Sequence, residues 1–212
     1  MIVFLAPLLV MSAAVTQADV PPVPGLCTAP VPIDRDAPGC YKTSELALHD
    51  VGQQLYWHIH GFTSESKAMT EARRHRYAAT TEMHGQAWLY VLGGPSEQIT
   101  GGIRRAVIGP LAVPSADTIA HFAAATFPPG MRTRVHAHPG AEAFYVVSGE
   151  QCMETPAERR TIAAGETYIV KDGPHLQAAP KGRRNLVLIL VPRGIPLITL
   201  RTDWHPTGFC DR

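Results

Sequence analysis

Residues 130–149 have the sequence GMRTRVHAHPGAEAFYVVSG, with two histidines one residue apart, a Pro-Gly turn and a glutamate that opens an apolar run. Successive side chains of an extended strand point to opposite faces, so His136 and His138 share one face. The Pro-Gly turn then reverses the chain, and Glu142 on the returning strand can bring a carboxylate oxygen to the same point. Two nitrogens and one oxygen on a rigid hairpin form a facial ligand set for a metal ion.

A fourth ligand is expected from a strand that lies beside this hairpin. Residues 165–175, GETYIVKDGPH, contain an apolar strand, a polar turn and His175, which opens the next strand. The same alternation of faces places Arg134 with the two histidines and Gln177 with His175. We therefore predict one metal ion with the ligands His136, His138, Glu142 and His175.

The hairpin resembles the first motif of the cupin superfamily. That motif is a glycine, five residues, His-x-His, three or four residues, a glutamate, six residues and a glycine. Every named position is matched here, at Gly130, His136, His138, Glu142 and Gly149.

The second cupin motif matches less closely. Gly165 and Gly173 fit it, but Lys171 stands where the family has proline, Ala179 stands where it has asparagine, and one residue is missing before His175. The resemblance covers about residues 116–193. It implies an all-β fold, the cupin-type double-stranded β-helix or jelly roll, with one divalent metal ion. Iron, manganese, zinc, copper and nickel all suit the ligand set.

Size and composition predict one principal domain and limit its partners. The chain has 212 residues, of which 45% are hydrophobic and 17% charged, as in an ordinary globular protein. With 19 Lys and Arg against 18 Asp and Glu, there is no electrostatic case for nucleic acid or acidic membranes. The expected partner is a small-molecule substrate. The sequence leaves both a monomer and a homodimer as alternatives.

The first 18 residues, MIVFLAPLLVMSAAVTQA, are typical of an export signal, because the apolar run is too short to span a bilayer and ends in small residues. Cleavage is expected after Ala18 or Ala14, which gives a periplasmic or secreted protein with no membrane anchor. No Lys or Arg precedes the run. A mis-assigned start codon and a simple apolar first strand are therefore alternatives.

Four cysteines also favour export, since an even count in an oxidising compartment usually means disulfides. Three connectivities are open. We favour Cys27 with Cys40, which closes the Pro-rich segment on itself, and Cys152 with Cys210, which fastens the tail to the barrel. Four reduced thiols in a cytosolic protein are the alternative.

Three segments are predicted after the leader. Residues 19–40 contain six prolines and form an irregular arm. Residues 41–110 form a strand-helix-strand extension, in which the helix is capped by Ser64, runs to about Tyr77 and is followed by one strand near 80–93. A glycine-rich link and a turn at Gly109-Pro110 end this extension.

The cupin barrel with its C-terminal tail is predicted over residues 111–212. Its candidate strands are short and bounded by proline or glycine. They are 118–127, 132–138, 142–148, 150–154, 166–170, 175–179, 185–191 and 195–200.

A second copy of the metal spacing occurs in the extension, at Gly52, His58, His60 and Glu65. The residues after Glu65 have helical composition where the motif requires a strand, and no second motif follows. We therefore favour a packed or solvated pair of histidines over a second metal site.

Three imidazoles and a carboxylate leave coordination positions open on the metal, which is typical of a reactive site. Arg134 can hold a carboxylate or enolate by paired hydrogen bonds, and Gln177 can orient a substrate beside Glu142. The leading hypothesis is an exported enzyme that oxidises a small, anionic organic substrate in a dioxygenase-type reaction. The alternatives are a redox-neutral lyase or isomerase that uses the metal as a Lewis acid, and a periplasmic binding protein for a metal or small molecule.

Overall fold

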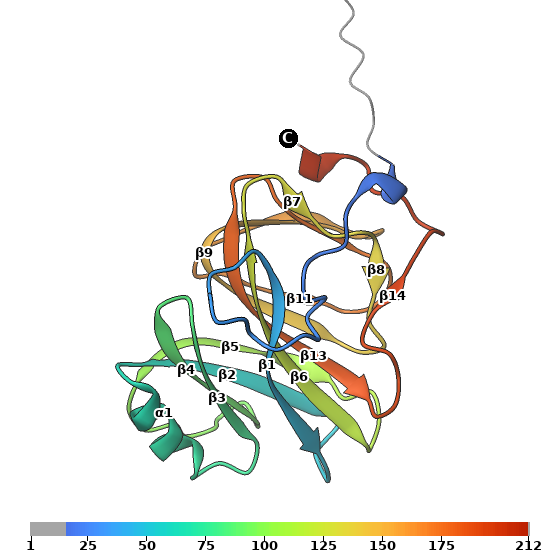
Figure 1. The fold of residues 1–212 in the computed structure, drawn as a ribbon. Helices are drawn as coiled ribbons and strands as arrows, with labels where there is room; N and C mark the ends of the chain where they lie inside the picture. Colours follow the sequence, from blue (N-terminus) through green and yellow to red (C-terminus); the bar gives the residue numbers. More distant parts are fainter. Residues whose placement is uncertain (1–15, 212) are drawn as a thin grey trace, which may run out of the picture.

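The computed structural model describes residues 16–211 of the chain. The predicted leader, residues 1–18, therefore lies almost entirely outside the described residues. The described part is dominated by β-strands, and the predicted all-β jelly roll is confirmed (Figure 1). Within residues 16–211 no helix is long and apolar enough to cross a membrane.

The barrel is built on an eight-stranded antiparallel sheet in the order β1-β6-β13-β9-β12-β7, with β10 and β11 also paired to β9. Its strands are β1 (Gly39–Leu48), β6 (Thr118–Phe127), β7 (Met131–Arg132), β9 (Glu142–Glu154), β10 (Arg159–Ala163), β11 (Thr167–Val170), β12 (Leu176–Ala179) and β13 (Arg183–Pro192). A separate short ladder joins β8 (His136–Ala137) to β14 (Thr199–Leu200). The two short helices at the ends are η1 (Gln17–Asp19) and η2 (Phe209–Asp211).

β13 lies inside the fold because both of its faces are apolar. It pairs with β6 on one side and with β9 on the other. Its alternate residues separate into two cores. Leu186, Leu188 and Leu190 join the core shared with the second sheet, and Val187, Ile189 and Val191 join the core inside the barrel.

β9 passes from one layer of the barrel to the other. Its first half pairs with β13 and β11, and its second half pairs with β10 and β12. The change of layer occurs at Gly149, which has φ +75° and approaches Gly182 so closely that a Cβ would lie 2.2 Å from the carbonyl oxygen of that residue. Only glycine fits this corner. Glu142 begins the half of β9 that pairs with β13 and β11.

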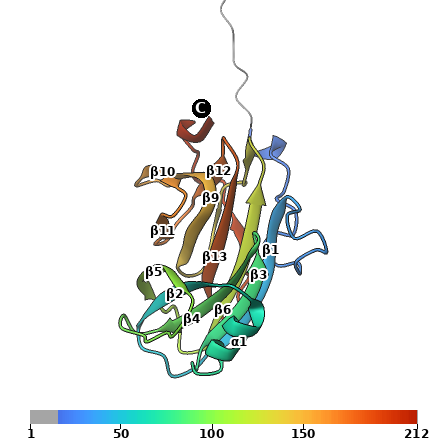
Figure 2. The same ribbon diagram turned by 90° about the vertical axis from the view of Figure 1, so that its left-hand side faces the viewer.

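A second sheet packs against the outside of the barrel. It has the order β3-β4-β2-β5 and consists of β2 (Gln54–Phe62), β3 (Ala78–Met83), β4 (Gln86–Gly93) and β5 (Ile103–Ala112). The rings of Trp57, Tyr90 and Phe122 join the two sheets, and Tyr90 stacks on Phe122 with ring centroids 5.0 Å apart. The far face is covered by α1 (Glu65–Ala72), as Figure 2 shows.

The elements predicted within residues 41–110 differ from the structure in three respects. Residues 41–48 form most of β1 and pair with β6, so they belong to the barrel sheet. The single strand predicted near 80–93 is a hairpin, because His84 and Gly85 both have positive φ and turn the chain. The helix ends at Ala72 and not near Tyr77.

Other boundaries in the barrel also differ from the prediction. Gly109-Pro110 lies within β5 and is not a turn, although the ladder with β2 is irregular opposite it, between Leu55 and Trp57. The predicted strand 132–138 is interrupted between β7 and β8, and 142–148 joins 150–154 in one long strand. The short polar strand β10 has no predicted counterpart. The division of the chain into domains stays a prediction.

Both favoured disulfides are present, Cys27–Cys40 and Cys152–Cys210. The first fastens the N-terminal arm to β1, and the second fastens η2 and the C-terminal tail to β9. In Figure 1 the arm and the tail lie close to the end of the barrel that carries β8 and β14.

Loop length predicts how much each disulfide stabilises the fold. Cys152–Cys210 spans 58 residues and Cys27–Cys40 spans 13. A cross-link lowers the entropy of the unfolded chain more when its loop is longer, so we expect losses of about 4 and about 3 kcal/mol when the respective pairs are replaced by serine. Urea titration of the two double variants measures this. A larger loss for the Cys27→Ser, Cys40→Ser variant would contradict it.

Acid is expected to destabilise the protein through His84. Its Nε2 hydrogen-bonds the carbonyl of Asn185 at 3.3 Å, which joins the second sheet to β13. Burial lowers the pKa of His84 to about 4, whereas a histidine in an unfolded chain titrates near 6.5. The unfolded state therefore binds more protons between these values, and the free energy of unfolding falls as the pH drops from about 6.5 to about 4. The His84→Asn variant should lose less stability over this window.

His49→Asn is the matched control, because the His49 side chain is exposed. It should lose stability over this pH window as steeply as the wild type does. Equal slopes for His84→Asn and wild type would show that His84 is not responsible.

Candidate metal centre

Three histidines converge inside one end of the barrel. His136 lies on β8, His138 follows it, and His175 precedes β12. One ligand atom from each lies within 4.8 Å of those of the other two. Two backbone hydrogen bonds of 3.1 and 2.9 Å, one in each direction, pair His136 with His175. This pairing brings together motifs that are almost forty residues apart in the sequence.

Each of the three imidazoles turns its Nδ1 toward a backbone carbonyl oxygen. Nδ1 of His136 lies 2.8 Å from the carbonyl oxygen of Arg134, Nδ1 of His138 lies 2.7 Å from that of Leu197, and Nδ1 of His175 lies 3.3 Å from that of Gly173. A carbonyl only accepts hydrogen bonds, so each Nδ1 carries a hydrogen. In the neutral tautomer of such a ring Nε2 keeps its lone pair, as in histidines that bind metals.

Glu142 lies beside this group. Its carboxylate oxygens are 3.1 Å from Nε2 of His175 and 3.5 Å from Nε2 of His138. Neither contact has hydrogen-bond geometry, and both Nε2 atoms are buried without a hydrogen-bond partner in residues 16–211. Two orphaned lone pairs and a buried carboxylate match the donor set of a divalent metal ion.

A cavity of about 410 Å³ opens onto these residues. The N-terminal arm forms one wall with Val23, Leu26 and the Cys27–Cys40 disulfide. Strands β6 and β13 and the segment before β14 form the rest. Their apolar contributors are Ala125, Phe127, Val187, Leu197, Ile198 and Leu200.

The sequence of this region matches the family model of the cupin domain over residues 124–192. The chain contains a cupin domain. The matched residues run from β6 to the end of β13 and include the three histidines and Glu142.

Solved structures with partial similarity include other cupins and two kinds of enzyme. A cupin superfamily protein from Desulfitobacterium hafniense DCB-2 has 14% identity and a TM-score of 0.33, covering 34% of this chain and 67% of its own. The DMSP lyase DddQ from Ruegeria pomeroyi DSS-3 has 20% identity and a TM-score of 0.35, covering 38% and 42%. An oxalate oxidase has 24% identity and a TM-score of 0.33, covering 38% and 45%. These scores are too low to carry a functional argument, and no curated protein matches significantly.

The structure places the predicted residues of the cupin domain at one cavity. His136, His138, Glu142, Arg134 and Gln177 all line it. His175 lies behind them, fully buried and in contact with Glu142. That these residues hold a metal stays a prediction.

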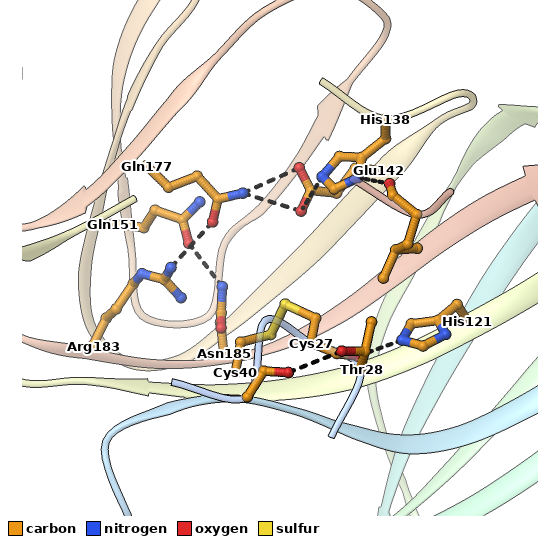
Figure 3. Close-up of a disulfide and its surroundings, with 12 residues drawn as sticks. Cys27, Thr28, Cys40, His121, His138, Glu142, Gln151, Gln177, Arg183 and Asn185 are labelled. Atoms are coloured by element: carbon orange, nitrogen blue, oxygen red, sulfur yellow. Dashed lines mark hydrogen bonds and ion pairs between the residues drawn. A yellow bond between two sulfur atoms is a disulfide. The ribbon is translucent and has the colours of Figure 1, made fainter. Parts of the chain in front are cut away.

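Gln177 orients the carboxylate of Glu142. Its Nε2 donates to both carboxylate oxygens, at 3.0 and 3.1 Å, and its Oε1 accepts from Nη2 of Arg183 at 3.1 Å (Figure 3). The sequence prediction missed Arg183. It follows a Lys-Gly turn at the start of β13, where an arginine ordinarily faces solvent.

The protonation states suit metal binding. Burial lowers the pKa of His136 to about 3, with help from the neighbouring His175 and His138. Burial favours the protonated form of Glu142, but His138 and His175 hold its pKa well below the usual value. At neutral pH the centre therefore offers a neutral imidazole and an anionic carboxylate.

His58 and His60 lie on β2, outside the cupin domain. Nε2 of His58 hydrogen-bonds the carbonyl of Gly94 at 2.8 Å, and Glu65 begins α1. His58 and His60 do not belong to the group of side chains that could hold a metal in the described part of the chain. That group consists of His136, His138 and His175.

Replacing the candidate ligands should remove the metal. We expect about one metal ion per chain in the wild type by elemental analysis, little in the His136→Gln, His138→Gln variant, and partial loss in His175→Gln. The His58→Gln, His60→Gln variant is the matched control, because it removes two histidines with the same spacing from another strand. Full occupancy in the His136→Gln, His138→Gln variant would refute the predicted centre.

Proposed function

We propose that the protein is an exported mononuclear-metal enzyme that oxidises a small organic anion with dioxygen. One divalent ion is held by His136, His138, Glu142 and His175. The proposal is supported above all by the three Nε2 lone pairs and the buried carboxylate that converge beside an apolar cavity. A purely structural barrel would not need such a donor set.

A bound divalent ion supplies a Lewis acid and, if it is iron, manganese or copper, a centre for electron transfer. The residues around it supply position and environment. Gln177 holds both oxygens of Glu142, so this carboxylate keeps one orientation. The apolar walls keep water away from the reacting groups, which strengthens the electrostatic interactions within the cavity. Arg134 and Arg183 both line the cavity, and a guanidinium group there can bind the anionic end of a substrate.

Export is supported by the apolar leader and by the two disulfides, which are compatible with an oxidising, extracellular compartment. Mass spectrometry of protein from its native compartment should find a chain that begins near residue 15 or 19. An intact Met1 would contradict export. The proposed partner is a small-molecule substrate, with no nucleic acid and no membrane.

Turnover is tested by consumption of a metabolite. Protein loaded with Fe²⁺ is incubated with metabolite extract from its source, with and without dioxygen, and the mixtures are compared by mass spectrometry. The expected result is a compound consumed only with dioxygen, whose product has gained both oxygen atoms. The His136→Gln, His138→Gln variant is the control and should consume nothing.

Other outcomes identify the alternatives. Consumption without dioxygen would replace oxidation by a lyase or isomerase reaction. A compound that is retained unchanged and released by a chelator would identify a binding protein.

Glu142→Gln should separate catalysis from binding. Replacing the anionic ligand raises the positive charge on the metal and alters the acidity of whatever it binds. We expect part of the metal to remain while turnover falls by about 10-fold or more, because changing a residue that only hydrogen-bonds a metal ligand already costs about 10-fold. Turnover per bound metal equal to wild type would contradict a chemical role for this residue.

A further inference from the structure

Arg183 is a buried cation whose hydrogen-bonding capacity is only partly used. Its side chain is 4% exposed and lines the cavity of the metal centre. Nη2 donates to Gln177, and one face of the guanidinium lies 4.0 Å from the ring centroid of Phe127. Within residues 16–211, Nε and Nη1 are buried without a hydrogen-bond partner. Buried, unpaired donors on a charged group are strongly unfavourable. Nε and Nη1 of Arg183 therefore need a hydrogen-bond acceptor that residues 16–211 do not supply.

The charges around the cavity also lack an anion. Among the described residues that line it, Glu142 is the single carboxylate, whereas Arg134 and Arg183 are both cations. Glu142 is already engaged by Gln177 and by the histidines. A monoanion balances the guanidinium of Arg183, while a dianion would bring additional charge out of water.

Most of the remaining surface of the cavity is apolar, with Thr28 and Thr133 as polar exceptions. Val23, Phe127 and Val187 lie along its walls, and Leu26 and Leu200, both about half exposed, lie at its rim. A ligand that fills this space needs an apolar body as well as its charge.

We propose that the cavity binds a small monocarboxylate with an apolar body, and that Arg183 is the residue that binds its carboxylate. The proposal rests on the proposed function, because it takes the cavity beside the three histidines as the substrate site. It names Arg183, and not Arg134, as the anchor. A single carboxamide group, that of Gln177, separates Arg183 from Glu142. The proposed anchor therefore lies one hydrogen-bonded group away from Glu142.

The test uses hexanoate as the probe, with hexanamide, 1-hexanol and hexyl phosphate for comparison. Binding to the full mature chain is measured by calorimetry, in the metal-free form and in the Zn²⁺-loaded form, which carries out no oxidation. We expect hexanoate to bind more tightly than the three other compounds in both forms. A preference for hexanoate seen only with Zn²⁺ would mean that the metal binds the carboxylate, and tighter binding of hexyl phosphate would mean that the site takes a dianion. Either result overturns the proposal.

The Arg183→Gln variant should bind hexanoate about 10-fold to 100-fold more weakly, as expected for hydrogen bonds to a charged group. Its affinity for hexanamide and 1-hexanol should stay nearly the same, which a general loss of structure would not allow. Arg184→Gln is the matched control, because Arg184 is adjacent, exposed and paired with Asp36 at 3.1 Å. Loss of hexanoate binding in Arg134→Gln but not in Arg183→Gln would show that Arg134 binds the carboxylate, and would refute the proposal.

A measurement on the wild type covers the case in which Arg183→Gln does not fold. The Nε–H resonance of Arg183 in ¹⁵N-labelled protein should shift on addition of hexanoate and not of hexanamide. An unchanged resonance at saturating hexanoate overturns the proposal. Because none of these readouts needs turnover, they fail or succeed independently of the oxidation assay.

Discussion

The site depends on the burial of one negative charge. Glu142 is 3% exposed, and a carboxylate removed from water is tolerated only when it is paired and hydrogen-bonded. Gln177 donates a hydrogen bond to each carboxylate oxygen, and Arg183 supports Gln177 from the other side. Nε2 of His138 and Nε2 of His175 lie 3.5 and 3.1 Å from the carboxylate without hydrogen-bond geometry. A divalent ion beside the three Nε2 atoms would complete the compensation.

The scaffold keeps these groups in place through the backbone. The pairing of His136 with His175 sets the distance between the two motifs, and carbonyl groups fix the tautomer of each imidazole. The disulfide between Cys27 and Cys40 holds the irregular arm against the cavity, so a segment without regular structure becomes a wall of the site. The rigid strands supply the ligands, and the tethered arm supplies the apolar lining.

The sequence predicted best where one local pattern carries the information. Strand parity placed His136 and His138 on one face, and the apolar run of β13 indicated a buried strand. It failed where the determinant is a contact between distant segments. β1 has no strict alternation and is a barrel strand because β6 pairs with it. Arg183 likewise looks like a surface residue until Gln177 and Phe127 enclose it.

The most direct test of the metal centre is anomalous diffraction from crystals of protein purified from its native compartment, recorded at the absorption edge of the metal found. The account predicts one anomalous peak per chain, within bonding distance of Nε2 of His136, His138 and His175 and of a carboxylate oxygen of Glu142. A peak bonded to Nδ1 atoms, or a metal bound elsewhere while these four side chains remain as described, would contradict it.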